Sequence, residues 1–132
     1  MSLPASFAIL YVLYKNGGRL TYPELVHKVA EVQDKLPLAD KYEFKWCVIK
    51  KGDRHCTKRR DALTEEERKI AQPYDSKLEE DICLLESNGF VNVEYGLCPE
   101  EFDTLYECEH THITLTDRGK EIVQKLINKV EY

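Results

Sequence analysis

Residues 78–91 read LEEDICLLESNGFV, a pattern that predicts a helix running directly into a strand. Ser76 and Glu79 have the spacing of a capping box at the start of this helix. Its apolar positions recur at helical intervals: Leu78, Ile82 and Leu85. Asn88-Gly89 ends the helix, because glycine adopts a left-handed backbone at little cost. Residues 90–95 then follow as a strand.

Residues 113–121 read ITLTDRGKE and predict the opposite order, a strand that leads into a helix. We expect a returning strand over residues 105–115, joined to the preceding strand by a loop over residues 96–104. Thr116 is placed to cap the final helix. That helix carries an apolar stripe: Ile122, Val123, Leu126, Ile127 and Val130.

Two more helices are predicted near the N-terminus. Residues 4–16 are apolar on nearly every side, which favours a buried helix that ends at Gly17-Gly18. Thr21 and Glu24 form a second capping box, and Pro37 ends the helix that they begin.

The segment between Pro37 and the helix that contains residues 78–88 is the least regular part of the chain. Tyr42, Phe44 and Trp46 alternate with polar residues, which indicates a strand. The basic residues that follow are expected in an exposed hairpin tip or loop. Thr64 and Glu67 then predict a short helix closed by a proline.

This order of elements resembles the winged helix-turn-helix family. The resemblance rests on residues 78–91 as the third helix and first wing strand, and on residues 113–121 as the second wing strand and last helix. Tyr42-Glu43-Phe44 and Pro73-Tyr74-Asp75-Ser76 are similar to small prokaryotic, often archaeal, members with an extra segment before the third helix. The resemblance implies an α+β fold: a three-helix core, a two-stranded wing and a C-terminal helix. We expect one domain over residues 1–132, with an inserted basic segment at about 37–72.

Charge is distributed very unevenly along the chain, whose net charge is −5. Residues 45–60 hold seven Lys and Arg against one Asp, a sum of +6. Residues 78–117 hold eleven Asp and Glu and no Lys or Arg. A cationic surface is what a polyanion requires, so the basic segment is the predicted footprint for nucleic acid.

The family resemblance implies a DNA-binding transcriptional regulator whose third helix enters the major groove. Here that helix and the wing are acidic, so we expect double-stranded DNA to be contacted instead by the basic insert and the start of the third helix. The predicted DNA-binding residues are Lys50, Lys51, Arg54, Lys58, Arg59, Arg60, Tyr74, Ser76 and Lys77. The alternative is a winged-helix protein–protein interaction module, whose acidic third helix and wing bind a basic protein partner.

The five cysteines contain no CxxC pair, and no export signal or apolar run of membrane-spanning length is found. We therefore expect a cytoplasmic protein with mostly reduced thiols and no membrane contact. A disulfide, Cys98 with Cys108 or Cys47 with Cys56, is an alternative if the source is a hyperthermophile. A zinc site on Cys98, Cys108, His110 and His112 matches no standard spacing, so no metal is predicted.

Nothing in the sequence indicates catalysis: the phosphate-binding, hydrolase and metalloprotease motifs are missing. We expect no enzyme activity and no cofactor. The first and last helices favour a homodimer that pairs through them, because a helix that is apolar all round needs burial on more than one side. The other interpretation is that the two helices cover each other within one chain.

Overall fold

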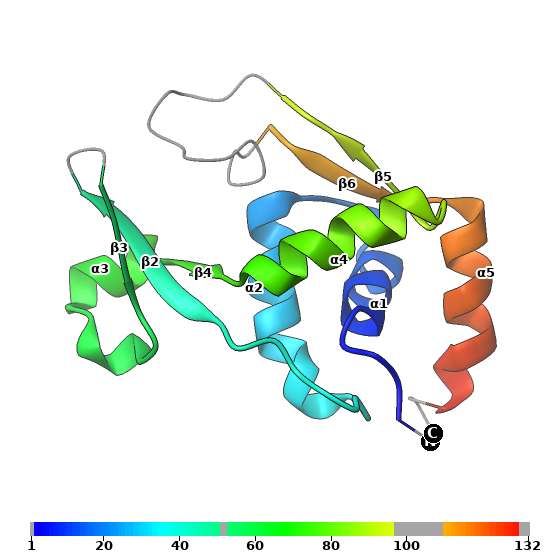
Figure 1. The fold of residues 1–132 in the computed structure, drawn as a ribbon, viewed down its shortest axis with the longest axis horizontal. Helices are drawn as coiled ribbons and strands as arrows, with labels where there is room; N and C mark the ends of the chain where they lie inside the picture. The colour runs from blue at the N-terminus through cyan, green and yellow to red at the C-terminus, as the bar shows by residue number, and fades with distance from the viewer. Residues whose placement is uncertain (1, 51–52, 97–109, 130–132) are drawn as a thin grey trace.

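Strands from the N-terminal and C-terminal parts of the chain form one antiparallel sheet, with strand order β1-β6-β5. The computed structural model describes residues 2–50, 53–96 and 110–129 (Figure 1). The strands are β1 (Arg19–Thr21), β5 (Val91–Glu94) and β6 (His112–Leu115). Ile113 of β6 lies opposite Leu20 on one side and Val93 on the other. The protein is therefore of the mixed α+β class that the sequence predicts.

Four helices pack with this sheet around the main core. They are α1 (Phe7–Lys15), α2 (Tyr22–Val32), α4 (Ser76–Ser87) and α5 (Asp117–Leu126), and short 3-10 turns follow α2 (Gln33–Lys35) and α5 (Ile127–Lys129). The most deeply buried side chains come from the four helices and from β5 and β6: Ile9, Leu13, Leu25, Val29, Leu78, Ile82, Val91, Ile113 and Val123. The predicted inward face of α4 is confirmed, because Leu78, Ile82 and Leu85 are all buried.

The segment between α2 and α4 forms a second antiparallel sheet, with strand order β3-β2-β4. Its elements are β2 (Lys45–Lys50), β3 (Asp53–Thr57), a 3-10 turn (Arg60–Ala62), α3 (Glu65–Ile70) and β4 (Gln72–Tyr74). Figure 1 shows this sheet and α3 beside α2, away from α1 and α5. Val48, Leu63 and Ala71, with Trp46 packed against them, form its own small core.

Several element boundaries differ from the sequence prediction. β1 was not predicted, because three residues are too few to show a strand period. Residues 42–44 lie outside the strand, which begins at Lys45. The third helix is capped by Asp75, whose carboxylate accepts from two backbone amides, so the predicted capping box on Ser76 is wrong. The capping boxes at Thr21 and Thr64 and the cap at Thr116 are confirmed.

The burial of α1 bears on the predicted homodimer. Its apolar side chains are covered within one chain, since α2, α5 and β6 all contact this helix. Six of its nine residues are buried: Phe7, Ala8, Ile9, Leu10, Val12 and Leu13. Much of α1 is therefore covered within one chain, and the homodimer through the first and last helices stays a prediction.

No helix among the described residues combines the length and the apolar character needed to cross a membrane.

Candidate nucleic-acid interface

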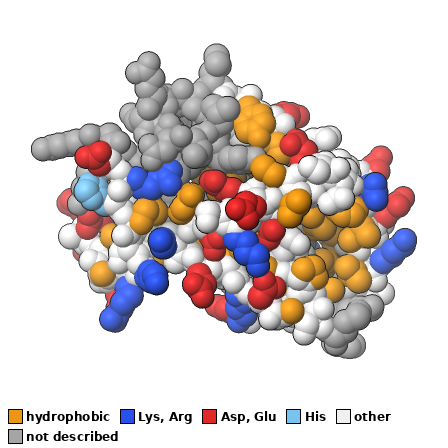
Figure 2. All heavy atoms as spheres, viewed as in Figure 1, with side chains coloured by type: hydrophobic (Ala, Val, Ile, Leu, Met, Phe, Trp, Pro, Cys, Tyr) orange, Lys and Arg blue, Asp and Glu red, His pale blue; other side chains and the backbone are white. Residues whose placement is uncertain are grey.

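The predicted basic residues lie largely on one hairpin, which we call the basic arm and define as residues 45–60. Its strands β2 and β3 pair antiparallel from Trp46 opposite Thr57 to Lys50 opposite Asp53. Lys51 lies outside the described residues, and Lys50 is described for its backbone only. Figure 2 shows Lys and Arg side chains spread over the side of the molecule that carries this arm.

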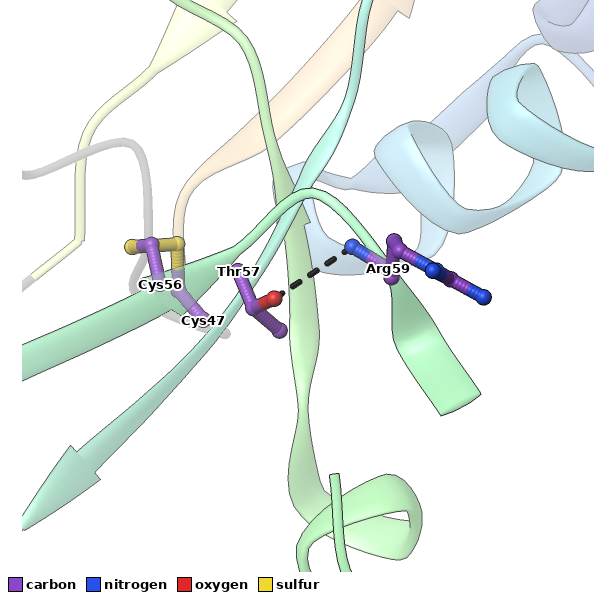
Figure 3. The surroundings of a disulfide bond; sticks show 4 residues. All are labelled: Cys47, Cys56, Thr57 and Arg59. Atoms are coloured by element: carbon purple, nitrogen blue, oxygen red, sulfur yellow. Dashed lines mark hydrogen bonds between the residues drawn. A yellow bond between two sulfur atoms is a disulfide. The ribbon is translucent and has the colours of Figure 1, made fainter. Parts of the chain in front are cut away.

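A disulfide joins the two strands of the arm (Figure 3). Cys47 and Cys56 are directly opposed in the β2–β3 register, with their Cα atoms 4.0 Å apart. The expectation of mostly reduced thiols is therefore wrong for this pair, and one of the two alternative disulfides is formed. The other alternative, Cys98 with Cys108, lies outside the described residues.

Two arginines of the arm lie over aromatic rings. The Arg54 guanidinium is 4.7 Å from the centre of the Tyr74 ring, and that of Arg60 is 4.7 Å from the centre of the Trp46 ring. Such stacking orders a planar guanidinium while leaving N–H groups at its edge to donate. The arrangement is suited to recognition of phosphate oxygens, which accept from paired guanidinium N–H groups.

Lys58 and Arg59 are exposed cations that directly follow β3. Lys58 is exposed, and the Arg59 side chain keeps 79% of its surface accessible. Arg59 contacts Asp61 at 3.3 Å, a pair exposed on both sides. Exposed pairs of this kind contribute about 0–1 kcal/mol, so Arg59 can exchange Asp61 for a phosphate at little cost.

A contact between α2 and the arm places Trp46 beside His27. The two ring centres are 6.3 Å apart, and His27 is half-buried. Burial lowers the pKa of His27, and Arg60 acts in the same direction, whereas a hydrogen bond with Gln72 and the charge of Glu31 oppose it. Burial thus favours the neutral form of His27, whose ring lies beside Trp46 of the arm.

The start of α4 is arranged differently from the prediction. Asp75 accepts from the backbone N–H of Lys77 at 2.7 Å and of Leu78 at 3.4 Å. These are amides that a phosphate would use at a helix N-terminus, and an internal carboxylate already occupies them. Lys77 itself is ion-paired with Asp40, which raises the pKa of Lys77.

A shallow cleft of about 350 Å³ lies between the arm and the start of α4. It brings together three of the predicted residues, Tyr74, Ser76 and Lys77. It also contains Lys41 and Lys45, which the predicted set omits. Lys45 was already part of the +6 segment, so charge counting could have included it, whereas Lys41 reaches the cleft only through the tertiary fold.

Comparisons of this chain with family models, characterised proteins and solved structures found no match.

The carboxylates of α4 are largely engaged within the protein. The Tyr22 hydroxyl donates to Glu79 at 3.1 Å, and the Tyr42 hydroxyl donates to Asp81 at 2.6 Å. Glu86 accepts from the backbone N–H of Val93 at 2.9 Å. Together with the cap at Asp75, these contacts give four of the five acidic side chains at this helix an internal hydrogen bond.

Burial gives the Tyr22–Glu79 pair an unusual electrostatic setting. It raises the pKa of Glu79, while the hydrogen bond from Tyr22 and the nearby charge of Arg54 partly oppose the rise. The pKa of Tyr22 is raised as well, first by burial and then by Glu79. Arg54 therefore contacts β4 by stacking on Tyr74, and its charge also lies near Glu79 of α4.

No group of three or more His, Cys, Asp or Glu side chains with metal-binding geometry occurs among the described residues. Two of the four residues weighed for zinc, Cys98 and Cys108, fall outside that part of the chain.

Proposed function

We propose that this chain is a winged-helix protein that binds double-stranded DNA through its basic arm and acts as a transcriptional regulator. The element order and the β1-β6-β5 sheet support the winged-helix part of the proposal. In this interpretation α2 and α4 form the helix-turn-helix, β5 and β6 form the wing, and the second sheet is an insertion between the two helices.

The observation that carries the DNA-binding part is the concentration of ordered cations on the arm. Arg54 and Arg60 are held on aromatic rings, while Lys58 and Arg59 extend into solvent. Phosphate neutralisation by such side chains supplies most of the non-specific affinity for DNA. A two-stranded ribbon also fits the width of the major groove, so a hairpin of this form can contact both phosphates and bases.

The exposed side of α4 is less suited to that role. Glu80 faces solvent, and the hydrogen-bonded carboxylates of Glu79 and Asp81 stay close behind it. Their charges are screened only over about 8 Å at physiological salt, so they oppose the approach of phosphates. The proposal therefore assigns the main contact to the arm.

The salt dependence of duplex binding tests this assignment. The probe is a fluorescent 25-base-pair duplex, titrated with the full chain at two salt concentrations and followed by anisotropy. In the K58E/R59E variant we expect weaker binding at low salt. Each lost phosphate contact reduces the slope of log K against log salt by about 0.9, so loss of two contacts reduces it by about 1.8.

A matched control carries the same charge change at a distant site. Lys120 and Lys125 are exposed on α5, and the K120E/K125E variant changes the net charge by the same −4. We expect the control to keep the salt slope of the natural chain. Equal loss of slope in both variants would show that net charge, not the arm, governs binding, and absence of duplex binding by the natural chain at low salt would refute the function.

A second function has one specific observation in its favour. Leu84 is 58% exposed on the same side of α4 as Glu80, and Tyr95 is 50% exposed after β5. Apolar side chains beside carboxylates suit a basic protein partner better than a duplex. The probe is a lysine-rich peptide with apolar residues, and E80K and L84S should each weaken its binding. If they do so and the duplex does not bind, this second function replaces the first.

A further inference from the structure

The disulfide of the basic arm occupies a position that controls the arm's order. It joins β2 and β3 directly and closes a covalent loop over residues 47–56, which contains Arg54. Apart from contacts with α2, the support of this sheet among the described residues is a small core of Val48, Leu63 and Ala71 with Trp46 packed against them. A sheet with so few buried apolar side chains depends strongly on a covalent cross-link.

We propose that Cys47–Cys56 is a thiol-exchange site through which a dithiol reductant controls the order of the basic arm, and thereby its affinity for DNA. The first part rests on the position of the disulfide in the arm, the exposure of its two cysteines and the cations beside them. The second part rests on the function proposed above.

The two cysteines differ in exposure. Cys56 is exposed, whereas Cys47 is only 7% exposed. Exchange begins when a thiolate attacks a disulfide sulfur, so the reductant reaches the Cys56 sulfur first. Attack forms a mixed disulfide with Cys56 and releases Cys47 as a thiolate.

The second thiol of the reductant completes the reaction. It attacks the mixed disulfide, releases Cys56 as a thiolate and leaves the reductant as its own disulfide. Two electrons pass to the protein, and the two thiolates take up protons from solvent. The reverse sequence, with an oxidised dithiol, restores the bridge.

Cations on the same face of the sheet favour this chemistry. Side chains two residues apart on a strand point to the same side, so Lys45 lies beside Cys47 and Arg54 beside Cys56. Positive charge stabilises a thiolate and makes it a better leaving group. The side chains that give the arm its charge therefore also favour exchange at its disulfide.

The size of the effect follows from loop closure. The bridge has a sequence separation of 9. The chain-entropy relation for a loop of this length gives roughly an 80-fold change in the equilibrium between the ordered and the opened arm. Opening would free Arg54 and Arg60 from their ring contacts and scatter the charges of the arm.

Hydrogen exchange of the full chain tests the first part of the proposal. The C83S/C98S/C108S variant keeps Cys47 and Cys56 as its remaining cysteines, and it is measured oxidised and after treatment with dithiothreitol. The backbone amides of Val48 and His55, paired across the arm, should lose protection by roughly 80-fold on reduction. The amide of Ile113, in the other sheet, is the internal control and should not change.

Two additional measurements keep the test decisive. The first is the same exchange experiment on the natural chain, which guards against effects of the three substitutions. Alkylation and peptide mass mapping there report the thiol state of Cys47 and Cys56. A C47S/C56S variant should match the reduced protein under both conditions. Unchanged protection of Val48 and His55 on reduction would overturn the proposal.

Duplex binding by the oxidised and reduced forms tests the second part. We expect the reduced form to bind at least tenfold more weakly at the same salt concentration. If the arm opens but affinity is unchanged, the link between the disulfide and DNA is wrong. If the oxidised form binds no duplex while the arm still opens on reduction, the proposed function fails and the thiol-exchange site stands.

Discussion

Removal of the Tyr22 hydroxyl is expected to destabilise the protein through α4. Tyr22 is only 3% exposed, and its hydroxyl donates to the half-buried Glu79 at 3.1 Å. A hydrogen bond to a charged acceptor is worth about 1.5–3 kcal/mol, and solvent on the open side of Glu79 replaces part of it. We therefore expect Tyr22→Phe to cost about 1 kcal/mol, which lowers the melting temperature by about 4 °C for a chain of this length.

The assay is thermal and urea unfolding of a double-mutant cycle with Glu79→Gln. The single variants and the double variant should give a coupling free energy of about 0.5–1 kcal/mol between the two side chains. Tyr14→Phe is the matched control, because the Tyr14 hydroxyl makes no hydrogen bond to the described residues, and it should change stability by less than about 0.5 kcal/mol. A Tyr22→Phe chain as stable as the natural one, with no coupling to Glu79, would refute a structural role for this carboxylate.

Three other predictions follow from local geometry. Gly119→Ala should destabilise by about 1–2 kcal/mol in urea unfolding despite the better helix propensity of alanine, because its Cβ would clash with the Phe90 carbonyl oxygen. A gain in stability would contradict the packing of α5. Asp75→Ala should cost about 1 kcal/mol through loss of the α4 cap, whereas Asp75→Asn should retain most of it; equal loss in both would argue against capping. Burial lowers the pKa of His27 in the folded chain, so its contribution to stability is present above about pH 6.5 and is lost as pH falls through the lowered pKa. His27→Gln should therefore flatten this part of the curve of stability against pH. An unchanged curve would exclude His27 as the cause of the pH dependence.

The parts of the fold predicted from the sequence are those set by local signals. Thr21 with Glu24 and Thr64 with Glu67 place a side-chain acceptor and a carboxylate within one helical turn, so both capping boxes are visible in the sequence. At the start of α4 the same reasoning chose Ser76, because Glu79 follows it by three positions, whereas the residue that caps the helix is Asp75. The extended backbone of Asp75 decides between them, and the sequence does not show it.

The parts that could not be predicted depend on contacts between distant residues. Tyr22 and Glu79 are separated by 57 positions, so the acidic residues of α4 were interpreted as a bare surface charge. The contact of α1 with α5 likewise joins segments from the two ends of the chain, and no local pattern in the sequence shows it. Cys47 and Cys56 were recognised as one of two alternative pairs, and only their strand register distinguishes the pair that forms.

Mapping of backbone amide chemical shifts during a duplex titration tests the assigned contact surface most directly. We expect the largest changes at Arg54 and at residues 57–60, with small changes over the exposed side of α4 from Glu80 to Asn88. Large changes over that side of α4, with the arm unaffected, would contradict the assignment of DNA contact to the arm.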